Sequence, residues 1–224
     1  MIDTKTIENF LSDDEIAEIL AITPSWISAD KNKLYKKIEG LDRTANYHYF
    51  EFYKEQGKRV NEIILPKLQN SFHKDIYVDD CHILESYYPY DVHTDGAAPD
   101  NNGKKIFKEG YDAAWTFIIP LENYNSNTII FDQNSEDCKV PLQWIEKYDP
   151  PVLDSITDSV YNEHLTHAMT RDHSRYFSIK EIFPWKKGSI SGTSRNNFHC
   201  SDYFIGCGIK EKRAIVMWTT LTKN

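Results

Sequence analysis

From Ile76 onward the chain is a series of short apolar segments in which β-branched and aromatic residues predominate. These segments read IYVDDCHILESYYPYDVH, AAWTFIIPLENY, NTIIFDQ, SIKEIFPW and KRAIVMWTTLT, and each is bounded by Gly, Pro, Asn or Asp. Few helical patterns lie between them, which argues against a parallel sheet because parallel strands need crossover connections. The sequence therefore predicts a twisted antiparallel sandwich or barrel.

Two helices are predicted before the β-rich part. The first begins with a capping box formed by Ser12 and Glu15. The second lies within residues 49–75, where Gly57 and Pro66 leave its limits open. Apolar residues at helical spacing support both helices: Ile16, Ile19 and Leu20 in the first, and Val60, Ile63, Ile64 and Leu68 in the second. The predicted fold class is mainly β with N-terminal helices (α+β).

The length of 224 residues suits one domain. We expect residues 1–75 to form a helical lead-in and residues 76–224 a β core. Within this core, residues 97–110 read as an exposed loop, and residues 133–176 carry few strand signals but have helical potential around TDSVYNEHLTHAMTRDHSRYF. Long excursions in a compact domain are often lids or binding loops, so we predict that both are insertions at the mouth of the core.

Charge and composition narrow the classes of partner. The net charge is −8 and no basic run is present, which argues against a nucleic-acid partner. No apolar stretch approaches membrane-spanning length, and the first residues lack the basic and apolar parts of a secretory signal. The four cysteines form no CxxC and no regular framework, which favours free thiols. We therefore expect a cytoplasmic protein without a membrane partner.

A histidine and an aspartate two positions apart, His93 and Asp95, follow the tyrosine-rich run YYPYDV. Strand residues two apart point to the same face, so this imidazole and this carboxylate would converge. Such a pair is half of a metal site, although it is equally a plain polar surface pair. A metal site requires at least one further ligand from elsewhere in the chain.

Among the eight histidines, His199 has the most suggestive context. Its segment, FPWKKGSISGTSRNNFH, reads as a strand, a glycine-marked turn and a second strand. About a dozen residues later the last apolar strand begins with two adjacent cations, Lys212 and Arg213. The chain therefore presents a His-x-Asp pair, a long interval, a lone histidine and then a cationic residue at the start of a strand.

The other histidines have simpler interpretations. We interpret His48, His73 and His82 as surface, packing or structural residues. His164 and His167 lie three apart in a segment with helical potential and would share a helix face, which leaves a second metal site open. A solvated helix face is the simpler interpretation of that pair.

This arrangement resembles the iron(II)- and 2-oxoglutarate-dependent oxygenases that carry an HxD…H triad on a double-stranded β-helix, a jelly-roll or cupin-like fold. The resemblance rests on His93-x-Asp95 after a strand-like run, on a W-x-x-G…H segment that ends at His199, and on the basic residues beyond it. The lead-in IENFLSDDEIAEIL is similar to that of the prolyl-hydroxylase-like and phytanoyl-hydroxylase-like branches. The interval between the ligands exceeds that of many members, and the insertion at 133–176 would account for it.

The resemblance implies that His93, Asp95 and His199 hold Fe(II). Two neutral imidazoles and one carboxylate on one octahedral face are the ligand set of non-haem iron that activates oxygen. By analogy with the family, 2-oxoglutarate fills two of the three remaining positions and O2 the third. Tyr90 resembles the position whose hydroxyl supports the co-substrate, and it is equally a strand aromatic.

The remote carboxylate of 2-oxoglutarate would need a buried cation, because an unpaired buried charge is costly. Strand alternation lets only one of Lys212 and Arg213 point inward. Lys212 shares its face with Ala214, which leaves room for a ligand. Arg213 offers bidentate geometry but shares its face with bulky Ile215 and Met217, so the pattern favours Lys212 and leaves Arg213 open.

The implied reaction is the oxidative decarboxylation of 2-oxoglutarate to succinate and CO2, coupled to hydroxylation of an unactivated C–H group. The substrate would be a small molecule or a peptide, bound near aromatic residues such as Trp115, Tyr124 and Trp144. The alternative is a non-catalytic cupin-like or β-sandwich protein that binds a metal or another ligand. A hydrolytic zinc enzyme built on His164 and His167 is a third reading. The oligomeric state is left open.

Overall fold

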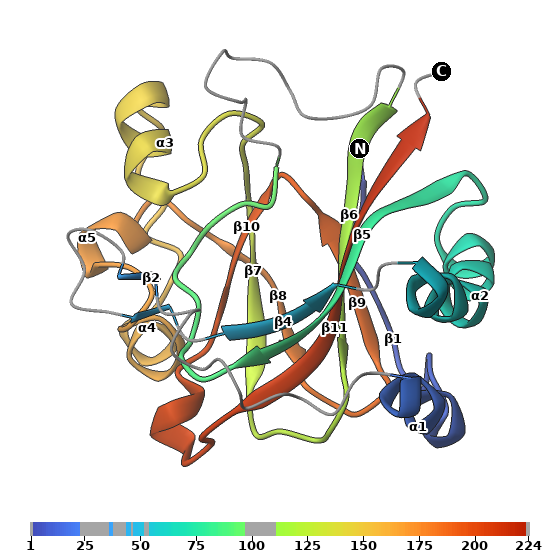
Figure 1. Cartoon of the computed structure of the whole chain (residues 1–224). Coiled ribbons are helices and arrows are strands. Elements are labelled where there is room, and N and C mark those ends of the chain that lie inside the picture. Colours follow the sequence, from blue (N-terminus) through green and yellow to red (C-terminus); the bar gives the residue numbers. More distant parts are fainter. Residues whose placement is uncertain are drawn as a thin grey trace.

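Two antiparallel sheets face each other in this computed structural model (Figure 1). It describes residues 2–22, 36–37, 44–45, 47–51, 54–96 and 111–222. The larger sheet contains, in spatial order, β1 (Lys5–Ile7), β9 (Ile190–Ser194), β6 (Tyr111–Pro120), β11 (Lys212–Thr222), β5 (Ile76–Ser86) and β4 (Tyr47–Glu51). The smaller sheet contains β10 (Asn197–Ser201), β7 (Asn127–Asn134) and β8 (Ile179–Pro184). The predicted mainly β fold with antiparallel pairing and few helices is confirmed.

The remaining elements are short or lie outside the sheets. The helices are α1 (Asp13–Ile22), α2 (Lys54–Ser71), α3 (Pro141–Tyr148), α4 (Asp158–His164), α5 (Arg171–Ser174) and the 3-10 helix η2 (Phe204–Cys207). A two-stranded pair is formed by β2 (Lys36–Lys37) and β3 (Thr44–Ala45). No described helix is long and apolar enough to cross a bilayer. All four cysteines are free thiols.

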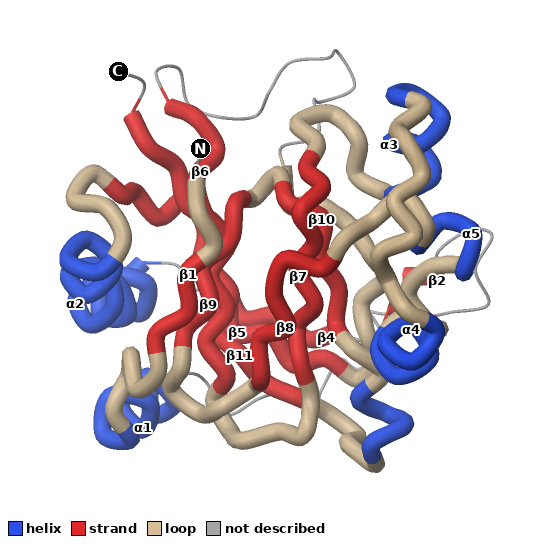
Figure 2. Tube along the Cα trace, turned by 180° about the vertical axis from the view of Figure 1, so that it is seen from behind, coloured by secondary structure: helices blue, strands red, loops and turns tan. Residues whose placement is uncertain are grey.

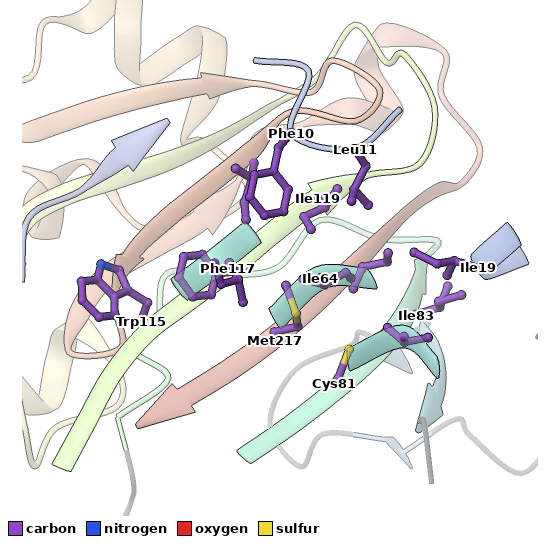
Figure 3. Close-up of a cluster of buried hydrophobic side chains, with 14 of the residues drawn as sticks. Phe10, Leu11, Ile19, Ile64, Cys81, Ile83, Trp115, Phe117, Ile119 and Met217 are labelled. Atoms are coloured by element: carbon purple, nitrogen blue, oxygen red, sulfur yellow. The ribbon is translucent and has the colours of Figure 1, made fainter. Parts of the chain in front are cut away.

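Helices α1 and α2 cover the outer face of the larger sheet (Figure 3). Ile19 of α1 and Ile64 of α2 belong to the same buried cluster as Met217 of β11. The predicted capping box is present, because the backbone N–H of Ser12 donates to Glu15 Oε2 at 2.8 Å and the backbone N–H of Glu15 donates to Ser12 Oγ at 3.2 Å. The helical lead-in therefore buries one face of the sheet and leaves the other face for the space between the sheets.

Helices α3, α4 and α5 lie on the opposite side of the molecule, over the smaller sheet (Figure 2). Phe177 is at the centre of this cluster, with its ring centroid 5.3 Å from that of Phe131, 5.3 Å from that of Phe198 and 5.4 Å from that of Trp144. The predicted helical potential within residues 133–176 is realised in these helices. The predicted loop at 97–110 lies outside the described residues.

Alternation along β11 decides which side chains face inward. Arg213, Ile215 and Met217 point to the outer face, and the latter two pack with the helices. Lys212, Ala214 and Val216 point toward the smaller sheet, where Ala214 and Val216 pack with Phe183 of β8 and with Trp185. The space between the sheets is therefore lined by the even-numbered residues of β11.

The structure differs from the sequence prediction in three local features. The predicted strand after Tyr87 is absent, since β5 ends at Ser86 and residues 87–92 form no strand. The predicted helix within 49–75 begins only at Lys54, because residues 47–51 pair with β5 as an edge strand. Three aromatics expected on a surface that binds the substrate, Trp115, Tyr124 and Trp144, instead pack into apolar clusters. Burial of their large apolar rings outweighs exposure at a binding surface.

Candidate metal centre

A backbone bridge brings the two predicted histidine ligands together. The backbone N–H of His93 donates to the carbonyl of His199 at 3.0 Å, and the reverse bond measures 2.9 Å. Residues that face each other in an antiparallel bridge project their side chains to the same side. The two imidazole rings accordingly lie with their centroids 4.5 Å apart. His199 is held on β10, and His93 follows the irregular segment 87–92.

Asp95 completes the group from the next position on the same side. Its Oδ1 lies 3.6 Å from His93 Nε2, and its Oδ2 lies 3.2 Å from His199 Nε2. One ligand atom from each of the three residues lies within 4.8 Å of the others. Thr116 of β6 orients the carboxylate, because its hydroxyl donates to Asp95 Oδ2 at 2.8 Å. The three residues predicted from the sequence are therefore brought together in the structure.

Hydrogen bonds on the far side of each ring define the tautomer that a metal requires. His93 Nδ1 lies 2.7 Å from the carbonyl oxygen of Asp91, and His199 Nδ1 lies 3.1 Å from that of Asn197. A carbonyl oxygen only accepts, so both Nδ1 atoms carry the proton. In the neutral rings both Nε2 atoms then present a lone pair toward Asp95, as in metal-bound histidines.

The three side chains of the triad shift one another's pKa values. Burial raises the pKa of Asp95, but His199, His93 and the Thr116 hydroxyl outweigh burial and hold this pKa well below its usual range. Burial and the neighbouring His199 lower the pKa of His93. Burial also lowers the pKa of His199, but the charge and hydrogen bond of Asp95 raise it above its usual value. A carboxylate between two imidazoles is therefore an anionic site suited to a divalent cation.

The two candidate anchors on β11 have opposite environments. Lys212 is 1% exposed, and its Nζ donates to Ser126 Oγ at 3.1 Å and lies 3.7 Å from the ring centroid of Trp185. Burial lowers the pKa of Lys212 to about 7. Arg213 lies on the other face, where its Nε is 2.8 Å from Glu85 Oε2. The structure therefore places Lys212 inward and pairs Arg213 with an acidic residue on the outer face.

The surroundings of Lys212 suit an anionic co-substrate. Within the described part of the chain, Ser126 Oγ is the only hydrogen-bond acceptor of its ammonium group, and no carboxylate oxygen lies within 4.0 Å. A buried ammonium with one neutral acceptor is poorly compensated. A ligand carboxylate at this position would compensate the charge.

The other predicted site residues take supporting or structural places. The ring centroid of Tyr90 lies 5.8 Å from that of His93. His167 Nε2 contacts the backbone oxygen of Ser201 at 2.9 Å and its ring stacks on Tyr203, while His164 lies 3.7 Å from Glu163. In the residues that the structure describes, no second group of three metal-ligating side chains converges, so the second metal site is not formed there.

Two of the remaining histidines have acidic neighbours. His82 is buried, and its Nε2 lies 2.7 Å from Asp80 Oδ2. His73 is exposed beside Asp75. The side chain of His48 lies outside the described residues.

Three polar or aromatic residues near Lys212 escaped sequence reasoning. Ser126, Trp185 and Asp202 surround the ammonium group or its hydrogen-bond partner. Trp185 belongs to the W-x-x-G…H segment, but its contact with Lys212 was not predicted. Ser126 and Asp202 belong to no motif, and their only signal was that Asp202 closely follows the predicted ligand His199. The hydrogen bond from Thr116 to Asp95 was not predicted from the sequence either.

Comparison with known proteins adds evidence on the fold. No protein-family model and no curated protein matches the chain. The epimerase SnoN, solved with Fe3+, α-ketoglutarate and nogalamycin RO, is similar with a TM-score of 0.57 and 13% identity, covering 98% of this chain and 78% of SnoN. The non-haem, α-ketoglutarate-dependent carbocyclase SnoK from nogalamycin biosynthesis has a TM-score of 0.56 and 14% identity, covering 97% of this chain and 79% of SnoK.

A viral collagen prolyl hydroxylase from Paramecium Bursaria Chlorella virus-1 has a TM-score of 0.49 and 14% identity, covering 98% of this chain and 96% of that chain, and identifies no branch. The chain therefore has the fold of the non-haem, α-ketoglutarate-dependent enzymes SnoN and SnoK.

Proposed function

We propose that the chain is a non-haem Fe(II)- and 2-oxoglutarate-dependent dioxygenase, with its two sheets wound as the double-stranded β-helix. The observation that supports this most is the convergence of His93, Asp95 and His199 together with a buried cation, Lys212, on the inner side of the larger sheet. A metal triad alone suits many proteins. A metal triad combined with an inward, poorly compensated ammonium group suits a bound dicarboxylate.

Each residue has a defined part in this proposal. The Nε2 atoms of His93 and His199 and one oxygen of Asp95 would hold Fe(II), because two imidazoles and one carboxylate are a ligand set that suits non-haem iron. Lys212 would pair with the remote carboxylate of 2-oxoglutarate. When bound, the iron and the co-substrate supply the capacity to activate O2, with succinate and CO2 as products.

The chain itself orients its ligands and limits access of water. The Thr116 hydroxyl holds the Asp95 carboxylate, and two backbone carbonyls hold the imidazoles with Nε2 toward the metal. Tyr90, whose ring lies beside that of His93, would support the co-substrate. Burial of Lys212 keeps the anchoring ion pair in a low-dielectric environment, where its electrostatic attraction is strong.

We propose hydroxylation of an unactivated C–H group in a small-molecule or peptide substrate. The carboxylate of Asp95 would be the third protein ligand to the metal, which favours oxygen transfer over halogenation. SnoN and SnoK show that an epimerase and a carbocyclase also use this fold. Product analysis therefore has to accompany any assay of 2-oxoglutarate consumption.

The test combines spectroscopy with turnover. Anaerobic addition of Fe(II) and 2-oxoglutarate should produce a weak visible charge-transfer band, and exposure to air should yield succinate. His93→Ala should abolish both, whereas His73→Ala, a surface histidine outside the triad, should retain both. If the wild-type protein shows neither band nor succinate, the chain is instead a cupin-like or β-sandwich metal- or ligand-binding protein.

A further inference from the structure

A buried chain of three polar side chains extends from the proposed anchor for 2-oxoglutarate. Lys212 Nζ lies 3.1 Å from Ser126 Oγ, and Ser126 Oγ lies 2.6 Å from Asp202 Oδ1. The exposed fractions of Lys212, Ser126 and Asp202 are 1%, 3% and 4%. These residues come from the start of β11, from the segment before β7 and from the segment after β10. The inference drawn from this chain rests on the proposed function.

The direction of the two hydrogen bonds follows from the chemistry of the groups. An ammonium group only donates hydrogen bonds, so Lys212 Nζ donates one to Ser126 Oγ. A carboxylate only accepts, so the single hydroxyl proton of Ser126 is directed to Asp202 Oδ1. The negative charge of Asp202 therefore polarises the Ser126 hydroxyl. The polarised hydroxyl oxygen is a stronger hydrogen-bond acceptor for Lys212.

Asp202 is fixed in this role by further hydrogen bonds. Its Oδ2 accepts from the backbone N–H of Asn127 at 2.7 Å and from Asn127 Nδ2 at 2.9 Å. The backbone N–H of Asp202 donates to the carbonyl of Asn127 at 3.1 Å. Both carboxylate oxygens are thus engaged, and the side chain cannot swing over to pair directly with Lys212.

The remaining environment of Lys212 is apolar. Its Nζ lies 3.7 Å from the ring centroid of Trp185 and 4.8 Å from that of Phe204. Two titratable groups, Asp202 and the buried thiol of Cys200, favour its charged form against the effect of burial. A thiol that burial keeps protonated carries no charge of its own, so Asp202 is the main electrostatic support.

We propose that Asp202 is a positioning residue that, through Ser126, keeps Lys212 protonated and directed toward the remote carboxylate of 2-oxoglutarate. The carboxylate stays one hydroxyl away from the ammonium group and so leaves a donor for the ligand. A direct Lys–Asp ion pair would satisfy the ammonium group and would repel an incoming anion. The intervening serine supports the charge without occupying the binding position.

Asp202→Asn tests this directly, because it removes the charge and preserves the shape. The metal-free proteins are labelled with 13C at the lysine ε carbons and titrated with pH by NMR. The titration midpoint of Lys212 should be lower by about one pH unit in Asp202→Asn than in the wild-type protein. Ser126→Ala should shift it in the same direction. An unchanged midpoint in both variants would overturn the proposal. Circular dichroism and thermal unfolding identify a variant that does not fold, in which case the other variant decides.

Binding of 2-oxoglutarate provides the second measurement. With Mn(II) in place of Fe(II), calorimetric Kd values are compared at pH 6 and pH 8.5. Asp202→Asn should weaken binding about tenfold at pH 8.5 and less than threefold at pH 6, because Lys212 is at least about half protonated in both proteins at pH 6. An equal loss at both pH values would indicate a merely structural role and would overturn the proposal.

Lys212→Arg supplies the matched control, since a guanidinium stays charged throughout this range. In the Lys212→Arg protein, Asp202→Asn should weaken 2-oxoglutarate binding less than twofold at either pH. The double-mutant cycle then isolates the coupling free energy between Asp202 and Lys212. A full tenfold loss in the arginine background would overturn the proposal. If the wild-type protein binds no 2-oxoglutarate at any pH, the proposed function fails, whereas an unmoved Lys212 midpoint overturns only the role of Asp202.

Discussion

Lys212→Met should make the folded protein more stable while it removes 2-oxoglutarate binding. Methionine keeps the length and apolar surface of the side chain and removes the buried charge. Burial lowers the pKa of Lys212 from 10.5 to about 7, whereas the unfolded chain retains the ordinary value. The unfolded state therefore binds more protons between these two values, and the lysine makes the protein less stable as the pH falls through this window.

The size of the effect follows from the shift. The difference of 3.5 units (10.5 − 7) corresponds to about 4 kcal/mol at pH 7 and about 2 kcal/mol at pH 9, at about 1.4 kcal/mol per unit. The lost hydrogen bond to Ser126 and the contact with Trp185 offset about 1–2 kcal/mol of this gain. We therefore expect Lys212→Met to be more stable than wild type by about 2–3 kcal/mol at pH 7, and the gain to vanish near pH 9.

Urea denaturation of the metal-free proteins at pH 7 and pH 9 measures this difference. Arg213→Met is the matched control, because it removes the adjacent cation from the outer face, where Glu85 would lose its partner. That variant should be less stable than wild type at both pH values. If Lys212→Met is destabilised at pH 7, or its difference from wild type is independent of pH, then Lys212 is not a poorly compensated buried charge. An anionic ligand would then have no poorly compensated charge to pair with at Lys212.

Three further predictions concern the metal centre and the helices over the smaller sheet. Thr116→Val removes the hydroxyl that orients Asp95 and should weaken Fe(II) binding about tenfold in an anaerobic competition titration, so an unchanged affinity would contradict its role. Because a metal binds only the neutral ring, metal affinity should fall as the pH drops through the raised pKa of His199. Calorimetry in buffers of different ionisation enthalpy should then detect the protons released on metal binding. Phe177→Ala should lower the free energy of unfolding by about 3–5 kcal/mol in urea titrations; a loss under 1 kcal/mol would show that the 133–176 helices pack loosely.

Much of the architecture could be predicted from local patterns. Segments rich in β-branched and aromatic residues, bounded by turn residues, marked most of the strands from Ile76 onward, and the Ser12–Glu15 box marked the start of α1. These features depend on residues that are close in sequence, so the local sequence pattern is sufficient to predict them. The triad of His93, Asp95 and His199 was also predicted, since its residue types and order restrict the chemistry before any geometry is known.

The partners of these residues were decided by the tertiary structure. Alternation alone could not determine which face of β11 is internal, because both faces of this central strand are buried and either cation was compatible with the pattern. Stacking of the smaller sheet made the side of Lys212 internal, and α1 and α2 covered the side of Met217. The same stacking brought Ser126 and Asp202 to Lys212 from separate segments.

What the sequence by itself determined is the class of fold, the strand order along the chain and the residue types of the site. Only the tertiary structure decided that Thr116 orients Asp95, that the 133–176 helices cover the outside of the smaller sheet, and that a serine stands between Lys212 and Asp202. The physical reason is that local periodicity specifies which face of an element is apolar. Contacts between distant segments depend instead on how the faces of two sheets are stacked, which no single segment encodes.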